Sequence, residues 1–190
     1  MGYGMIIDQQ LCVGCSACTI ACKIENNTPV GFNWCDKIQS TTGTFPDVRH
    51  EYISTMCNHC ENAPCVAACP TQAMHKDTDT GLTLHDPDKC IGCKACIINC
   101  PYGVISYNWD TPHADWREGD RVAEGCFSPR ELVEAVGGDG TPTSNPERDT
   151  TYPSVRARGT VEKCTFCDHR LAEGLEPACV EACPSGARQF

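Results

Sequence analysis

The stretch that decides the fold reads Cys90-Ile91-Gly92-Cys93-Lys94-Ala95-Cys96-Ile97-Ile98-Asn99-Cys100-Pro101. Its cysteines follow a C-x2-C-x2-C-x3-C spacing, which places three thiols on one short loop. This spacing is typical of a loop that wraps around a [4Fe–4S] cubane, with backbone N–H groups facing the sulfurs. The fourth cysteine opens a short helix and points toward a neighbouring site, and the proline turns the chain away.

Three other parts of the chain hold comparable groups of cysteines, so 16 of the 18 cysteines form four quartets. The quartets are Cys12, Cys15, Cys18 and Cys22; Cys57, Cys60, Cys65 and Cys69; Cys90, Cys93, Cys96 and Cys100; and Cys164, Cys167, Cys179 and Cys183. Only Cys35 and Cys126 stand outside them. We expect these two to be small, partly buried thiols without a redox role.

Four quartets predict four [4Fe–4S] clusters, with all sixteen cysteines as the metal ligands that bind them. Structural zinc is the main alternative, and it prefers two separated C-x2-C knuckles. Only the fourth quartet has that form, because the triple C-x2-C-x2-C of the first and third packs three thiolates too tightly. A disulfide scaffold is disfavoured, since no secretory context accompanies the cysteines.

The pairing of the quartets depends on their separation along the chain. Only residues 70–89 separate the second quartet from the third, enough for one hairpin, so these two are expected to exchange fourth ligands. The first and fourth then pair across the chain ends. The expected ligand sets are Cys57, Cys60, Cys65 with Cys100; Cys90, Cys93, Cys96 with Cys69; Cys12, Cys15, Cys18 with Cys183; and Cys164, Cys167, Cys179 with Cys22. Spacing alone leaves open a pairing of first with second and third with fourth.

Charge and hydropathy argue against binding to nucleic acid and against a membrane-spanning segment. The 190-residue chain carries a formal net charge of −10, which offers no basic face to nucleic acid. No apolar run approaches the roughly 18 residues of a membrane span, so we expect no direct membrane span. The first residues lack the basic and apolar segments of an export signal, so we expect no export signal of the chain's own.

Short strands and helices are expected around the cysteine loops. The predicted elements are strands at 3–8, 51–55, 102–107 and 187–190, a helix at 16–25, a hairpin of 73–76 with 82–85, and a loop over 26–46. A repeated strand, cysteine loop, short helix and strand is the pattern of a ferredoxin-type fold. The fold class is therefore α+β, with two interleaved, pseudo-symmetric modules that resemble bacterial ferredoxins and hold two clusters each.

The expected domain division follows the pairing of quartets. One module comprises residues 1–50 plus 160–190 and holds quartets one and four, while residues 51–107 form the other and hold quartets two and three. Residues 108–159 are a long loop insertion between the third and fourth quartets, with one short helix at 130–136. A loop this long in a small protein is typically functional, and we expect it to dock a partner.

Four segments carry a resemblance to a known family. They are Ile7-Asp8 with Cys12-Val13-Gly14-Cys15; Cys57-Asn58-His59-Cys60-Glu61-Asn62-Ala63-Pro64-Cys65; Cys90-Ile91-Gly92-Cys93; and Lys163-Cys164-Thr165-Phe166-Cys167-Asp168-His169-Arg170-Leu171. They resemble the iron–sulfur electron-transfer subunit of the dimethyl sulfoxide reductase family of molybdenum enzymes. Glu25-Asn26-Asn27-Thr28, Gly43-Thr44-Phe45-Pro46-Asp47 and the long insertion are similar to the arsenate respiratory reductase branch. Polysulfide, thiosulfate and tetrathionate reductases and catechol dehydroxylases are similar too.

The resemblance implies the pairing of first with fourth and second with third quartets. It also implies a catalytic partner that holds a molybdenum bis-molybdopterin guanine dinucleotide cofactor, and often a membrane anchor that exchanges electrons with quinol. Such a subunit would be peripheral, in a complex at the cytoplasmic membrane, and on the outer face only if a partner's signal carries it there.

The chain shows no Ser–His–Asp set, phosphate-binding loop or dinucleotide fingerprint. That favours a non-catalytic electron-transfer subunit over an enzyme. We expect it to relay electrons between a membrane anchor or external donor and the molybdopterin subunit. The alternative function is a free-standing polyferredoxin that diffuses between partners.

Overall fold

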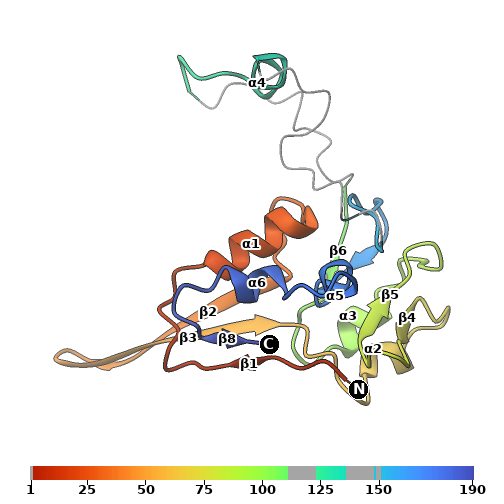
Figure 1. Cartoon of the computed structure of the whole chain (residues 1–190), viewed down its shortest axis with the longest axis horizontal. Coiled ribbons are helices and arrows are strands. Elements are labelled where there is room, and N and C mark those ends of the chain that lie inside the picture. Colours follow the sequence, from red (N-terminus) through yellow and green to blue (C-terminus); the bar gives the residue numbers. More distant parts are fainter. Residues whose placement is uncertain (1, 111–122, 136–147, 149–150) are drawn as a thin grey trace.

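The computed structural model describes residues 2–110, 123–135, 148 and 151–190. Its elements are short and alternate with the cysteine loops (Figure 1). In chain order they are β1 (Ile6–Ile7), α1 (Ala17–Asn26), β2 (Cys35–Thr44), β3 (Asp47–Met56), α2 (Pro64–Ala67), β4 (Met74–Lys76), β5 (Thr83–His85), α3 (Ala95–Asn99), β6 (Ser106–Tyr107), α4 (Pro129–Ala135), β7 (Val161–Glu162), α5 (Asp168–Ala172), α6 (Ala178–Glu181) and β8 (Arg188–Gln189). This mixture of small helices and strands confirms the α+β class.

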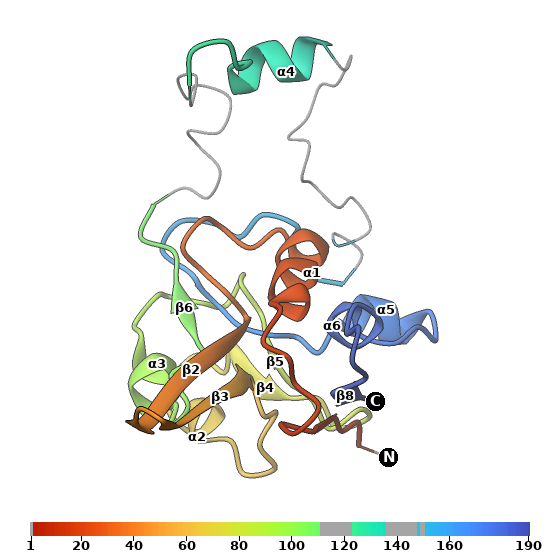
Figure 2. The ribbon, with the colours of Figure 1, turned by 90° about the vertical axis from the view of Figure 1, so that its left-hand side faces the viewer.

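The two ends of the chain lie side by side, as both views show (Figure 1, Figure 2). β1 pairs antiparallel with β8, with Ile7 opposite Arg188. The Asp8 N–H donates to the Ala187 carbonyl oxygen at 2.8 Å and extends the pairing. The Tyr3 and Phe190 rings stack beside it at 5.6 Å between centroids. The loop of the first quartet is thereby held beside the end of the fourth.

The prediction of a loop over residues 26–46 is wrong for the second half of that segment. Residues 35–44 form β2, which pairs over its whole length with β3 in a long antiparallel hairpin. The segment is polar, yet Thr41, Thr42 and Thr44 are β-branched and suit an extended ribbon with both faces near water. Only the base of the hairpin is buried, where Cys35 lies opposite Met56.

The hairpin expected between the second and third quartets is confirmed, because β4 pairs with β5. The strand expected at 102–107 is shorter than predicted and is confined to β6. β6 pairs with β7 from the far side of the 108–159 segment. Two backbone hydrogen bonds continue this contact, Asn108 N–H to Thr160 O at 3.0 Å and Gly159 N–H to Asn108 O at 2.8 Å. Both ends of that segment are therefore joined.

The helices follow the cysteine loops and pack in pairs. α1 contacts α6 and α2 contacts α3, so each contact joins two quartets. The helix expected within the insertion is present as α4, which stands apart from the other elements in both views (Figure 1, Figure 2). The rest of the insertion between 111 and 150 lies largely outside the described residues.

Two small cores lie among the cysteines. The first gathers Trp34, Leu82, Tyr152 and Phe166 with cysteines of the first, second and fourth quartets. The second gathers Met74, Ile105 and Val161 with cysteines of the second and third. Cysteine side chains are thus part of both cores. In the described part of the chain, no helix combines the length and the apolar character needed to cross a bilayer.

Candidate metal centres

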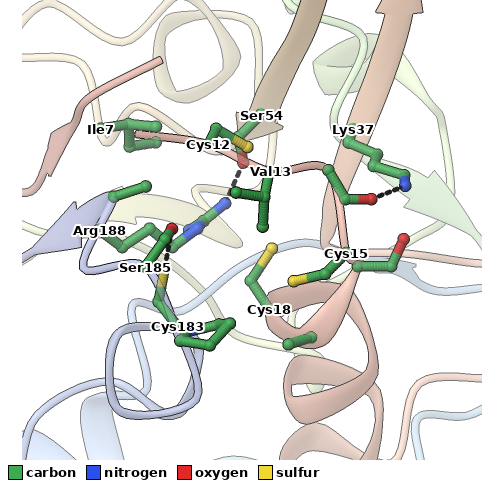
Figure 3. A pocket seen from close by; sticks show the side chains of 15 residues that line it. Ile7, Cys12, Val13, Cys15, Cys18, Lys37, Ser54, Cys183, Ser185 and Arg188 are labelled. Atoms are coloured by element: carbon green, nitrogen blue, oxygen red, sulfur yellow. Dashed lines mark hydrogen bonds between the residues drawn. The ribbon is translucent and has the colours of Figure 1, made fainter. Parts of the chain in front are cut away.

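Cysteines from the two chain ends line a common hollow, which we call site A (Figure 3). Cys12, Cys15 and Cys18 come from the loop before α1 and its first turn, and Cys183 comes from the turn between α6 and β8. Lys37 reaches into the wall of site A from β2 and donates to the Gly14 carbonyl oxygen.

A second group of cysteines, site B, lies buried behind α1. It comprises Cys22, Cys164, Cys167 and Cys179. Burial raises the pKa of Cys22 well above its usual value, and the neighbouring Cys164, Cys167 and Cys179 raise it further. Burial also raises the pKa of Cys167 to about 11, although the Ala178 backbone N–H opposes the shift. Four thiols this close and this buried require positive charge before all can ionise.

The second and third quartets line two further hollows. Cys57, Cys60, Cys65 and Cys100 line site C. Cys69, Cys90, Cys93 and Cys96 line site D. In each site three cysteines come from one quartet and one comes from the other. The structure therefore brings together Cys100 with the second quartet and Cys69 with the third, and it places Cys183 with the first and Cys22 with the fourth. Iron ligation by these sixteen thiols stays a prediction.

The separation of the cysteine side chains suits a cluster better than a single ion. A structural zinc ion holds four thiolates at about 2.3 Å and leaves no empty space between them. Among the residues that the structure describes, no three His, Cys, Asp or Glu side chains lie close enough to hold one metal ion. The cysteines thus fit a group that keeps the sulfurs apart, as a [4Fe–4S] cluster does.

The four sites follow one another through the molecule. Burial raises the pKa of Cys179 in site B, and Cys18 of site A adds to the shift. Burial likewise raises the pKa of Cys164 in site B, with Cys57 of site C adding to it. Burial raises the pKa of Cys96 in site D to about 11, and Cys90 and then Cys65 of site C contribute. The sites are therefore neighbours in the order A, B, C, D.

A lysine contacts the loop or the flanking rings of every site. Lys76 donates to the carbonyl oxygens of His59 at 2.8 Å and Cys60 at 2.7 Å, beside site C. The buried Lys163 donates to the Cys164 carbonyl oxygen at 2.8 Å, beside site B. Lys94 lies over the Trp109 ring at 3.6 Å, beside site D. Together with Lys37 at site A, these cations offset the negative charge that thiolates bring.

A place next to a quartet in the sequence identifies some of the lysines that lie beside the cysteine sites, but not all of them. Lys94 lies inside the third quartet and over the Trp109 ring, whereas Lys23 directly follows the first quartet. Lys23 instead donates to the carbonyl oxygens of Pro29 at 2.9 Å and Phe32 at 2.7 Å, closing the loop after α1. Lys37 and Lys76 come from strands that are distant in sequence from the loops they contact, so no local signal marks them.

His59 is buried between sites B and C. Its Nδ1 accepts a hydrogen bond from the Thr83 N–H at 3.1 Å, and its ring packs edge-on against Phe166 at 5.1 Å between centroids. Burial and the nearby Lys163 and Lys76 lower the pKa of His59 to about 2. The ring is therefore neutral with its proton on Nε2, an atom with no hydrogen-bond partner among the described residues.

The two cysteines outside the quartets differ from the expected partly buried thiols. Cys126 is exposed in the segment before α4, and Cys35 is fully buried at the start of β2. A hydrogen bond from Cys35, together with the charge of Arg188, lowers the pKa of Cys18 in site A to about 5. Cys35 thus lies directly behind a site, which sequence spacing does not reveal.

Comparison with known families identifies the cysteine-rich regions. Residues 48–127 and 150–190 match the family described as "4Fe-4S dicluster domain". Residues 9–31 match the family described as "4Fe-4S binding domain". Together these matches cover the cysteine loops of all four sites.

Individual relatives align over nearly the whole chain. The chain is 58% identical over 189 residues to the arsenate respiratory reductase iron–sulfur subunit of Shewanella sp. (strain ANA-3), covering 99% of this chain and 80% of that protein. It is 35% identical over 184 residues to a selenate reductase subunit of Mesobacillus selenatarsenatis, covering 94% of this chain and 56% of that protein. It is 34% identical over 188 residues to a tetrathionate reductase subunit of Salmonella typhimurium, covering 98% of this chain and 56% of that protein. The chain thus spans little more than half the length of the last two.

Proposed function

Since this chain belongs to the iron–sulfur subunits of the dimethyl sulfoxide reductase family, we propose that it is the non-catalytic electron-transfer subunit of a respiratory oxidoreductase complex. We propose further that it carries four [4Fe–4S] clusters on the sixteen cysteines of sites A to D. The observation that carries this proposal is the grouping of those cysteines, four by four, around adjoining sites.

The order of the sites supports a relay. When bound, a [4Fe–4S] cluster supplies a one-electron redox centre. The cysteine loops hold sites A and D at opposite ends of the series, while site B is buried between site A and site C. Side chains of the first core, including Phe166 and Leu82, keep water from the middle of the path.

The division into two modules is also proposed, with the bounds expected from the sequence. Residues 1–50 plus 160–190 would hold sites A and B, and residues 51–107 would hold sites C and D. The β1–β8 pairing and the α1–α6 contact support the first module, and the β4–β5 hairpin and the α2–α3 contact support the second. Residues 108–159 would form the docking insertion, of which the structure describes 108–110, 123–135, 148 and 151–159.

The proposed partner is a catalytic subunit that holds molybdenum bis-molybdopterin guanine dinucleotide. The 58% identity to an arsenate respiratory reductase subunit favours a partner of that branch. A membrane anchor that exchanges electrons with quinol, or an external donor, would supply electrons at the other end. The complex would then be peripheral at the cytoplasmic membrane.

An apolar ridge on α1 favours a bound subunit over a freely diffusing polyferredoxin. Ile20 and Ile24 lie one turn apart and expose 56% and 59% of their surface, and Val30 beyond the helix exposes 92%. Neighbouring exposed aliphatic side chains are typical of a surface that another protein covers. Purification of the native protein tests this point: we expect it with a molybdenum-containing large subunit, and a stable monomer that accepts and donates electrons alone would favour the polyferredoxin.

The ligand sets are tested by single substitutions and EPR spectroscopy of the reduced complex. We expect Cys183→Ser to alter the same cluster signal as Cys12→Ser, because both cysteines line site A. The matched control is Cys126→Ser, which changes an exposed cysteine outside every quartet. If Cys183→Ser instead alters the signal that Cys164→Ser alters, the exchange of fourth ligands is wrong.

A further inference from the structure

One position recurs after three of the four quartets. The fifth residue beyond the last cysteine is Met74 after the second quartet, Ile105 after the third and Arg188 after the fourth. All three side chains are buried, with 1%, 6% and 4% of their surface exposed. Because two of these turns hold an apolar side chain, the turn itself does not require a charge at this position.

Soft, uncharged groups surround the Arg188 guanidinium. Its Nη1 and Nη2 donate hydrogen bonds to Met56 Sδ at 3.1 Å, Cys179 Sγ at 3.4 Å, Met5 Sδ at 3.5 Å, Cys35 Sγ at 3.0 Å and Ser54 Oγ. Sulfur is a weak acceptor, so these contacts compensate little for the water that the guanidinium loses. Among the described residues, Arg188 forms no ion pair with a carboxylate.

Two other deeply buried arginines in the described part of the chain do have carboxylate partners. Arg148 pairs with Asp168 at 3.1 Å and Arg156 pairs with Glu162 at 2.6 Å. Burial of an arginine is costly unless a negative charge lies nearby, and arginine does not lose its proton in proteins. Arg188 therefore needs an anion that is not a carboxylate.

Sites A and B lie on either side of Arg188. Its side chain lines the hollow of site A, which Ser54 and Cys183 also line (Figure 3). Its Nη1 contacts Cys179 of site B directly. The Cys35 thiol accepts a hydrogen bond from Nη2 and belongs to the core against which Cys18 of site A packs. One guanidinium thus reaches ligands of two sites.

We propose that Arg188 tunes the two neighbouring clusters, its buried charge raising the reduction potentials of sites A and B above the values they would have without it. The inference rests on the proposed function, since it requires clusters at both sites. Each cluster becomes more negative by one charge when it is reduced. A cation held in the low-dielectric interior stabilises the reduced form more than the oxidised form. Sites C and D, with Met74 and Ile105 at the equivalent positions, have no such charge there.

Redox titration followed by EPR spectroscopy tests the proposal on the purified complex. Arg188→Met copies the residue of the second quartet, Arg188→Gln removes the charge but keeps a donor, and Arg188→Lys keeps the charge. At a solution potential that half-reduces the wild-type clusters, both neutral variants should show at least a tenfold lower ratio of reduced to oxidised cluster at sites A and B. For a one-electron couple this is a shift of about 59 mV to lower potential.

Two further variants separate the effect of the Arg188 charge from the effect of a changed structure. Arg188→Lys should stay within about threefold of the wild-type ratio at the same solution potential, which is about half of that 59 mV shift or less. Arg49→Met removes the same charge from a side chain that is 77% exposed and should leave every cluster unchanged.

Other results of these measurements would overturn either the tuning role of Arg188 or the proposed function. Unchanged potentials in both neutral variants, with full iron content, would overturn the tuning role and leave the proposed function intact. Loss of iron in both neutral variants would show that Arg188 holds the fold together, and would also overturn it. A wild-type complex without the cluster signals of sites A and B would overturn the proposed function instead.

Discussion

Gly92 and Gly103 share a left-handed backbone, with φ of +68° and +63°, but differ in their surroundings. A Cβ on Gly92 would collide with the carbonyl oxygen of Gly159, whereas a Cβ on Gly103 would meet nothing within 4 Å. Both Gly→Ala substitutions carry the left-handed cost of about 1–2 kcal/mol. We expect Gly92→Ala to cost a further 1–3 kcal/mol or so through overpacking.

The effect of Gly92→Ala should also reach the metal, because Gly92 lies in the loop of site D. We expect a lower urea midpoint and less iron per chain than in Gly103→Ala, measured by chemical unfolding and iron analysis. Equal midpoints and equal iron in the two variants would mean that the contact with Gly159 does not shape the loop.

Lys76 acts on a single loop through two charged hydrogen bonds, to the carbonyl oxygens of His59 and Cys60. Lys76 is half-buried, and removing a charged donor so that its acceptors are left unpaired costs about 1–3 kcal/mol. We therefore expect Lys76→Met to speed the loss of iron from site C to a chelator. Lys89→Met is the control, since Lys89 is exposed and pairs only with Asp86 at 2.7 Å among the described residues. Equal rates of iron loss would refute the role assigned to Lys76.

At the scale of elements, Arg156 joins the end of α1 to β7. Its guanidinium pairs with Glu162 at 2.6 Å and donates to the carbonyl oxygens of Asn26 at 2.7 Å and Asn27 at 3.0 Å. Arginine and glutamate are both fully buried. Breaking a buried pair by removing one partner costs about 3–5 kcal/mol, and we expect this loss in Arg156→Met.

The double variant Arg156→Met with Glu162→Gln tests the cause of that loss. Removing the second charge should restore part of the free energy of unfolding, because no unpaired carboxylate stays buried. Chemical unfolding of the wild type, the single variants and the double variant gives the coupling directly. Additive losses would show that Arg156 does not stabilise the fold through its pairing with Glu162.

Local patterns predict some elements well and others poorly. The spacing of the first quartet anticipates α1, and turn residues at 77–81 anticipate the β4–β5 hairpin. The strand expected at 51–55 is confirmed within the longer β3, but β2 and the hairpin are missed, because these polar strands bury little beyond Cys35 and Met56 and so lack apolar alternation. β7 is missed because it exists only through its pairing with β6.

For the candidate sites too, the sequence predicts some of the residues and not others. Cysteine spacing marks the sixteen thiols, since cysteines two to four residues apart recur along the chain. Spacing leaves the source of the fourth cysteine open, because that depends on which loops the whole fold brings together. Arg188 and Cys35 carry no local signal either, for they meet sites A and B only when β8 pairs with β1 and β2 closes beside them.

At the scale of the whole molecule, the sites follow one another from the paired chain ends to the loops of quartets two and three. Site B lies buried in the middle, while Cys15 of site A and Cys93 of site D are exposed. Electrons would therefore enter and leave near sites A and D. An anionic chain with a net charge of −10 must place such ends against partners that tolerate negative charge.

The metal content of the purified native protein tests the central claim most directly. Iron, acid-labile sulfide and zinc are measured per chain on an anaerobic preparation of the complex, after subtracting iron held by any other subunit. Four [4Fe–4S] clusters predict about sixteen iron and sixteen sulfide per chain, with no zinc. About twelve iron with one zinc, or a colourless protein that contains zinc alone, would contradict the assignment of all sixteen cysteines to four clusters.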